Sequence, residues 1–361
     1  MTVDRTKRFP CLDGWRAVSI LIVLGSHCGH TGLPDSLVPT VWWLFSGKMG
    51  VRFFFVISGF LITSLLLQEY DRRGKISLRR FYARRALRIL PVYYAFLLVV
   101  FALQHFTAWH QSGAAWLGNL TFTTNYLGDN WVTGHLWSLA VEEQFYVLWP
   151  ILLVAIGCQN SKGLFIALAL PVVVAPLVRV IGYTKTAPII LQPFFSEYSF
   201  LQHFDSLAVG CLAAVLLVRK EHLVSQALGR FKRGGVLLAL VLIFTPHVLS
   251  RLLVAGMFTV PLGDSCQAIG FGMLILQGVL FPGGFAPLNW PVIRNLGVLS
   301  YSLYIWQQLF CASPKFFGWP DLWFMSMPGW LFAALLTAML SYYCFEKPLL
   351  GLRARFRPVA A

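Results

Sequence analysis

The sequence Leu12-Asp13-Gly14-Trp15-Arg16 is followed by an apolar run over residues 17–25 and then by Ser26-His27-Cys28. This stretch predicts a membrane helix that begins with charged residues and ends with a titratable imidazole. Charged and titratable side chains are costly inside a bilayer, so Arg16 and His27 are candidates for function. His27 lies eleven positions after Arg16, roughly 16 Å along a helix and on nearly the same face.

The rest of the chain has the composition of a membrane protein. Of its 361 residues, 57% are hydrophobic and 12% are charged, whereas a soluble domain has about 25% charged residues. No polar stretch is long enough to form a separate soluble domain. We therefore predict that residues 1–361 form a single domain embedded in a lipid bilayer.

The placement of the charges and the spacing of the cysteines argue against two other classes of protein, nucleic-acid-binding proteins and proteins stabilised by zinc or disulfides. The net charge is +15, but the basic residues cluster in short segments beside apolar runs, which is typical of cytosolic loops rather than of nucleic-acid binding. The seven cysteines are scattered singly and show no spacing of a zinc site or a disulfide framework. We expect no bound metal and no nucleic-acid partner.

The apolar runs predict an all-α polytopic bundle of about ten spanning helices with both termini in the cytosol. The expected spans are 13–30, 50–67, 87–105, 137–156, 163–181, 204–218, 235–253, 268–281, 296–311 and 330–345. The segment 114–127 is short and polar. We interpret it as a re-entrant or surface element, because this choice leaves the basic residues Arg219–Arg233 on the cytosolic side.

Polar residues gather at both ends of these spans. The loop before the third span and the start of that span hold the most basic segment, which includes Arg84, Arg85 and Arg88. At the outer level, His135, Ser138 and Glu142 have the i, i+3, i+7 spacing of one helical stripe.

Arginines lie at the cytosolic ends of the predicted spans, and a histidine and a carboxylate lie at the outer ends. This separation suits a long substrate that carries phosphates at one end. Arginine binds phosphate through bidentate, charge-assisted hydrogen bonds. A buried histidine next to a carboxylate can act as a general base or as a nucleophile. An acyl-coenzyme A has such an arm between its phosphates and its thioester.

Four motifs occur in an order and spacing that resembles the acyltransferase 3 family of integral-membrane O-acyltransferases over essentially the whole chain. They are Leu12-Asp13-Gly14-Trp15-Arg16 before His27, Phe54-Phe55-Val56-Ile57-Ser58-Gly59-Phe60, Arg84-Arg85-Ala86-Leu87-Arg88 and Trp137-Ser138-Leu139-Ala140-Val141-Glu142-Glu143-Gln144-Phe145-Tyr146. One position departs from the family pattern: Gln307 stands where a histidine is common.

The resemblance implies transfer of an acyl group, commonly acetyl from acetyl-CoA, to a sugar hydroxyl of a glycan, glycolipid or glycosylated natural product in a bacterial inner membrane. It implies that Arg16 and His27 are an essential pair and that Arg84, Arg85 and Arg88 serve the acyl-CoA donor. We place Glu142 with the catalytic pair as an orienting group. The candidate substrate-binding residues are Asp13, Arg52, His135 and Asp205.

Other interpretations stay open at this point. A proton-coupled exporter of a small molecule would use the same intramembrane histidine and carboxylates as a relay. His27 itself is compatible with direct transfer and with an acyl-histidine intermediate. A homo-oligomer is also compatible with the sequence.

Overall fold

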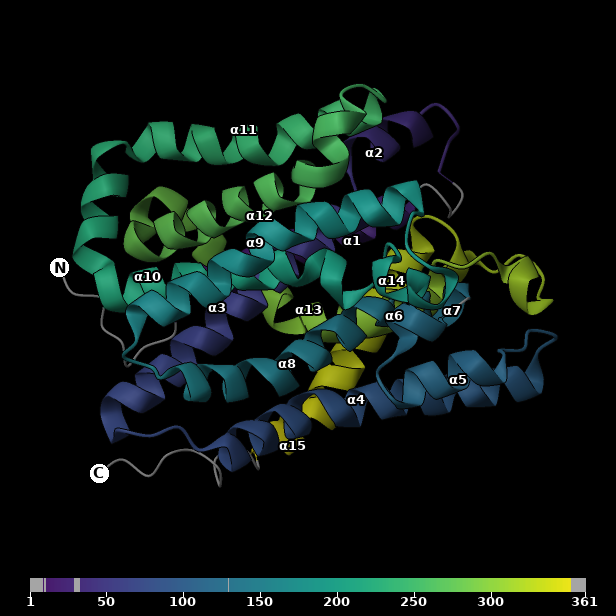
Figure 1. Cartoon of the computed structure of the whole chain (residues 1–361). Helices are drawn as coiled ribbons and strands as arrows, with labels where there is room; N and C mark the ends of the chain where they lie inside the picture. The colour runs from purple at the N-terminus through teal and green to yellow at the C-terminus, as the bar shows by residue number, and fades with distance from the viewer. Residues whose placement is uncertain (1–8, 10, 29–32, 129, 352–361) are drawn as a thin grey trace. The chain divides into compact units, whose positions relative to one another are not determined.

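The computed structural model describes residues 9, 11–28, 33–128 and 130–351, and it contains no strand among them (Figure 1). The prediction of an all-α bundle is confirmed. The α-helices, in chain order, are α1 Leu12–His27, α2 Val38–Leu44, α3 Gly47–Arg73, α4 Leu78–Phe106, α5 Gly113–Leu120, α6 Thr124–Leu127, α7 Trp131–Gly134, α8 Leu136–Ile156, α9 Ser161–Thr184, α10 Phe200–Arg230, α11 Lys232–Arg251, α12 Gly256–Leu280, α13 Pro291–Phe310, α14 Gly329–Leu340 and α15 Lys347–Gly351.

Short helices of other kinds connect them. The 3-10 helices are η2 Ile189–Phe195, η3 Pro282–Asn289, η4 Pro314–Phe317 and η5 Trp323–Met325. A π-helix, η6 Ser341–Glu346, continues α14.

Eight helical segments within the described residues are long and apolar enough to cross a membrane. Their bounds are Val38–Arg73, Leu78–Phe106, Trp131–Ile156, Ser161–Thr184, Ile189–Arg230, Lys232–Arg251, Gly256–Leu280 and Gly329–Gly351. The first and ninth predicted spans are also helical, as the 16-residue α1 and the 20-residue α13. The predicted end of the first span at residue 30 and both predicted cytosolic termini lie outside the described residues.

The polar segment 114–127 forms two short helices, α5 and α6, of eight and four residues. At about 1.5 Å per residue, neither helix is long enough to cross a bilayer. This agrees with the predicted short element between two longer spans.

The helices begin earlier than the predicted spans, and the differences are largest for α4 and α12. The prediction that the third span starts at residue 87 is wrong, because α4 starts at Leu78 and carries the basic cluster on its first turns. α10 runs from Phe200 to Arg230, with non-helical backbone at Lys220. α12 starts at Gly256 rather than at residue 268. Long basic side chains and polar groups with partners inside the protein allow a helix to extend beyond its apolar run.

The chain divides into two compact units, and the boundaries cut through α1, α8 and α13 and separate Gly47 from the rest of α3. Unit 1 comprises residues 1–19, 48–76 and 140–297, and unit 2 comprises residues 20–47, 77–139 and 298–361. The prediction of a single membrane domain stays a prediction.

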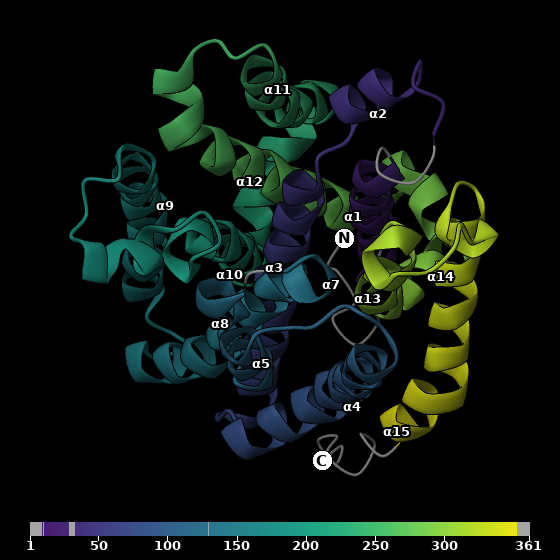
Figure 2. The same cartoon turned by 90° about the vertical axis from the view of Figure 1, so that its right-hand side faces the viewer.

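In unit 1, α11 and α12 form an antiparallel pair, and α12 also packs on α9 and α10 (Figures 1 and 2). α3 and α10 approach closely through glycine. A Cβ atom on Gly59 would lie 2.1 Å from the carbonyl oxygen of Leu207, and one on Gly210 would lie 2.1 Å from that of Val56. Small residues allow such backbone contact between membrane helices.

In unit 2, α4 packs against η6 and α15 near the C-terminal end of the described chain. Figure 2 shows α14 and α15 as one yellow column beside α4. α5 packs on α6, and the Tyr93 hydroxyl of α4 donates to the Asn119 carbonyl at 2.7 Å. These contacts fix the helix that carries the basic cluster.

Candidate functional site

His27 is the last residue of α1, and one of its ring nitrogens is engaged by a buried amide. Its Nδ1 lies 2.7 Å from Oε1 of Gln307 on α13. The Gln307 side chain is completely buried. The indole of Trp131 packs edge-on against the imidazole, with ring centroids 5.7 Å apart.

A second glutamine continues this polar contact. Gln307 Nε2 donates to Oε1 of Gln308 at 3.1 Å, and Gln308 Nε2 donates to the carbonyl oxygen of Trp131 at 2.9 Å. We call His27, Gln307, Gln308 and Trp131 the amide relay. All four residues belong to unit 2. His27 is the one member of the relay whose side chain can become charged, when it takes up a proton.

His135 lies between α7 and α8 and is buried. Its Nε2 lies 3.1 Å from the Ile305 carbonyl oxygen, and its own carbonyl accepts from the Tyr304 hydroxyl at 3.0 Å. The Ser138 hydroxyl contacts the same tyrosine hydroxyl. His135 has right-handed helical backbone at the junction of α7 and α8, so the predicted stripe through Ser138 to Glu142 begins at this junction.

Glu142 lies on the part of α8 that belongs to unit 1. Its carboxylate accepts a hydrogen bond from the Ser58 hydroxyl of α3, and Tyr146 donates to the same hydroxyl at 3.2 Å. The structure thus gives Glu142 a partner on α3. Its predicted orientation of His27, which is in unit 2, stays a prediction.

Asp13 and Arg16 lie in the first turns of α1. Arg16 Nη1 is 4.0 Å from Asp13 Oδ1, and both side chains are partly exposed. The carboxylate is in the first turn, where the helix dipole favours a negative charge. Arg16 and His27 are on the same helix, as predicted, and their roles stay predictions.

Arg84, Arg85 and Arg88 are half-buried on α4. Arg84 and Arg88 are one helical turn apart on one face, and Arg85 lies 5.8 Å from the ring centroid of Phe81. Arg88 interacts electrostatically with Glu346, which also accepts from the Ser302 and Ser341 hydroxyls. The three basic groups are therefore close together in unit 2.

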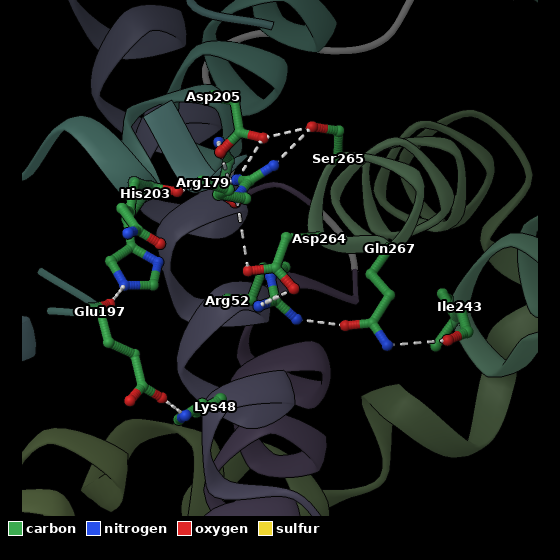
Figure 3. A network of polar contacts seen from close by, with 12 residues as sticks. Lys48, Arg52, Arg179, Glu197, His203, Asp205, Ile243, Asp264, Ser265 and Gln267 are labelled. Carbon is green, nitrogen blue, oxygen red and sulfur yellow. Dashed lines mark hydrogen bonds and ion pairs between the residues drawn. The ribbon is translucent and has the colours of Figure 1, made fainter. Parts of the chain in front are cut away.

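Unit 1 contains a network of ionised side chains, shown in Figure 3, in which Arg52, Arg179 and Asp205 are buried and Asp264 is partly exposed. Arg179 Nη2 lies 2.7 Å from Asp205 Oδ2, and Arg179 Nε lies 3.7 Å from Asp264 Oδ2. Arg52 Nη2 lies 2.5 Å from Asp264 Oδ1. We call Arg52, Arg179, Asp205 and Asp264 the charged network, in which two positive charges face two negative charges.

Neutral groups complete the charged network. Ser265 accepts from Arg179 at 2.9 Å and donates to Asp205 at 2.6 Å. Gln267 accepts from Arg52 and donates to the Ile243 carbonyl at 3.0 Å. Nearby, His203 contacts the Glu197 carbonyl at 2.9 Å, and Lys48 pairs with the Glu197 carboxylate (Figure 3).

Arg52 and Asp205 are substrate-binding residues predicted from the sequence, and the structure joins both to one network through Arg179 and Asp264. Those two partners were missed. Asp264 fell outside the predicted span that started at residue 268. A single arginine in the apolar span 163–181 was a signal that could have identified Arg179.

Among the described residues, no group of three or more His, Cys, Asp and Glu side chains could hold a metal ion. The expectation that the protein binds no metal stays a prediction.

A family model described as an acyltransferase domain matches residues 9–346. The chain belongs to this family. With its long apolar helices, it is an integral membrane protein.

Bacterial relatives match most of the chain. The Bacillus subtilis protein named "Putative peptidoglycan O-acetyltransferase YrhL" is 26% identical over 371 aligned positions, covering 94% of this chain and 54% of the relative. The peptidoglycan O-acetyltransferase OatA of Listeria monocytogenes is 26% identical over 345 positions, covering 84% of this chain and 50% of the relative. The chain thus spans about half the length of these curated relatives. No solved structure matches it.

Proposed function

We propose that this chain is a membrane O-acyltransferase that moves an acetyl group from acetyl-CoA to a sugar hydroxyl of a bacterial envelope glycan, in the inner membrane and with both termini cytosolic. The observation that carries the proposal is the match to the acyltransferase family over residues 9–346, which includes His27. Two relatives with peptidoglycan O-acetyltransferase in their names favour a cell-wall glycan as the acceptor.

His27 is the proposed general base. It takes the proton of the acceptor hydroxyl as the hydroxyl oxygen attacks the thioester carbonyl carbon. The tetrahedral intermediate then collapses, the carbon–sulfur bond breaks, and the imidazolium returns its proton to the leaving thiolate. The products are the sugar ester and free coenzyme A. The hydrogen bond from His27 Nδ1 to Gln307 supports this role, because a base must be held in one orientation.

The donor is proposed to bind through Arg84, Arg85 and Arg88. Three guanidinium groups within two turns of α4 suit the phosphates of acyl-CoA. Arg16 is proposed to contact the donor along α1, and Glu142 to orient His27 or the acceptor. Asp13, Arg52, His135 and Asp205 stay candidate substrate-binding residues.

A transfer assay tests the proposal. The purified chain in lipid nanodiscs would receive radiolabelled acetyl-CoA and soluble peptidoglycan glycan strands. We expect labelled ester on the glycan, and a loss of about 100-fold or more in His27→Ala, because a general base contributes about 10²–10⁴-fold. His105→Ala is the matched control, since His105 is exposed near the end of α4, where its ring packs on Phe101 and its Nδ1 lies 3.3 Å from the Phe101 carbonyl oxygen.

Wild-type turnover in His27→Ala would contradict the proposed role of His27. Absence of both transfer and acetyl-CoA binding in the wild type would instead favour the exporter interpretation, because an exporter has no need of a phosphate-bearing donor.

A further inference from the structure

Each hydrogen bond of the amide relay has a defined donor and a defined acceptor, so the relay determines which atom of Gln307 faces His27. It runs from the Trp131 carbonyl through Gln308 and Gln307 to His27 Nδ1, with distances of 2.9, 3.1 and 2.7 Å. The residues come from α1, α7 and α13 of unit 2. Gln307 and Gln308 are 0% and 3% exposed, so neither amide can exchange these partners for water at low cost.

The fixed end of the relay is the backbone. A carbonyl oxygen can only accept, so the group of Gln308 that faces Trp131 is its NH₂. The Gln308 oxygen is then the atom that faces Gln307, and it too can only accept. The Gln307 NH₂ must donate to it, which turns the Gln307 oxygen toward His27.

A second donor agrees with this orientation of Gln307. The Cys311 thiol lies 3.6 Å from the same Oε1 atom. A thiol is a weak donor, and the Gln308 carbonyl oxygen also lies 3.6 Å from Cys311 Sγ, so this contact agrees with the orientation of Gln307 set by the Trp131 carbonyl but does not determine it. Hydrogen-bond partners of this kind are what distinguish the two ends of a side-chain amide.

We propose that Gln307 is a positioning residue that fixes neutral His27 in the tautomer with the proton on Nδ1, so that Nε2 is the basic nitrogen. An amide oxygen can only accept a hydrogen bond, so the Nδ1 atom that faces it must carry the proton. A neutral imidazole carries only one such proton, which leaves Nε2 without one. Trp131 contributes twice, because its carbonyl sets the direction of the relay and its indole packs against the imidazole ring.

This arrangement suits a base that gains and loses a proton in each cycle. Nδ1 donates to Gln307 in both the neutral and the protonated state of the ring, so no hydrogen bond of the relay has to break. Gln307 carries no charge, so it orients the ring without the strong stabilisation of imidazolium that a carboxylate would provide. The ring is therefore held ready to accept a proton through Nε2.

The catalytic meaning of this tautomer rests on the proposed function, but the tautomer itself does not. It can be measured by nitrogen NMR on the full chain in nanodiscs with ¹⁵N-labelled histidine, with the His27 signals assigned by their loss in His27→Ala. We expect the proton on Nδ1 in the wild type. A proton on Nε2 of neutral His27 would overturn the proposal, whether or not the protein transfers acetyl groups.

Three variants separate positioning from packing. Gln307→Leu removes the acceptor and should abolish the preference for Nδ1, whereas Gln307→Glu keeps an acceptor and should retain it. Gln277→Leu is the matched control, because Gln277 is also a buried helical glutamine and its Nε2 has no hydrogen-bond partner among the described residues. Retention of the Nδ1 tautomer in Gln307→Leu would also overturn the proposal. A confirmed tautomer without acetyl transfer would refute the proposed function alone.

Discussion

The charged network of unit 1 and the amide relay of unit 2 are both largely buried polar clusters among apolar helices. They satisfy their buried polar groups in opposite ways. The charged network places two arginines against two aspartates, and its net charge is zero. The amide relay contains no fixed charge and is ordered by the direction of its hydrogen bonds.

The difference indicates what each cluster can do. Each member of the charged network is needed to neutralise another, so a change of one charge leaves a buried charge without compensation. This favours a structural role in holding α3, α9, α10 and α12 together, in addition to the substrate binding proposed for Arg52 and Asp205. The relay can take up one proton at His27 without losing a partner, which suits a group that works by proton transfer.

The largest expected effect is on stability, from Arg179→Ala. Asp205 is completely buried and would lose its ion pair with Arg179. Removal of one partner of a buried pair costs about 3–5 kcal/mol of folding free energy. Chemical denaturation of the purified protein in detergent would measure it. A stability close to that of the wild type would show that the charged network does not hold unit 1 together.

The next effect is on catalysis, from Gln307→Leu. We expect an activity loss of about 10- to 100-fold, or roughly 1.4–2.7 kcal/mol in the activation barrier. The substitution removes the acceptor for His27 Nδ1 but keeps an apolar side chain of similar size in a buried position. Steady-state rates and a denaturation curve would be compared with those of Arg179→Ala. A large stability loss with normal activity per folded molecule would reverse the assignment of the two clusters.

A smaller effect is expected from the basic cluster. Arg84→Gln or Arg88→Gln should raise the KM for acetyl-CoA about tenfold with little change in kcat, which is about 1.4 kcal/mol of binding. Arg80→Gln is the control, because Arg80 is exposed on the same helix. Equal KM changes at Arg80 and Arg88 would mean that the arginines act only through non-specific electrostatic attraction of the donor phosphates.

The smallest effect on stability is expected from a more exposed ion pair, which serves as a reference for the charged network. Arg219 and Asp71 form an ion pair at 2.8 Å whose side chains are 19% and 31% exposed. Arg219→Ala should change the free energy of unfolding by about 0–1 kcal/mol, because solvent screens such pairs. Denaturation under the conditions used for Arg179→Ala would show whether burial, rather than pairing alone, determines the cost.

The sequence was sufficient to predict the helical class, the position of most spans and the short element at 114–127, since apolar run length and basic loops encode these directly. It also selected His27 and the four motifs of the family. Helix starts were less accurate, as at Leu78 and Gly256, because polar residues continue a helix when they find partners inside the protein.

The partners of the selected residues were beyond the reach of sequence patterns. Gln307 was noted only as a departure from the family pattern, and its contact with His27 joins positions 280 residues apart. Arg179 and Asp264 were missed for the same reason, since their pairing depends on how α9, α10 and α12 pack. Local spacing cannot encode contacts between distant helices.

A double-mutant cycle of His27→Ala and Gln307→Leu would show whether Gln307 affects acetyl transfer through the imidazole of His27. If Gln307 acts through the imidazole, removal of Gln307 should slow acetyl transfer in the wild type but cause no further loss in His27→Ala. Loss factors that multiply in the double variant would contradict the account, because they would show that Gln307 affects the rate independently of His27.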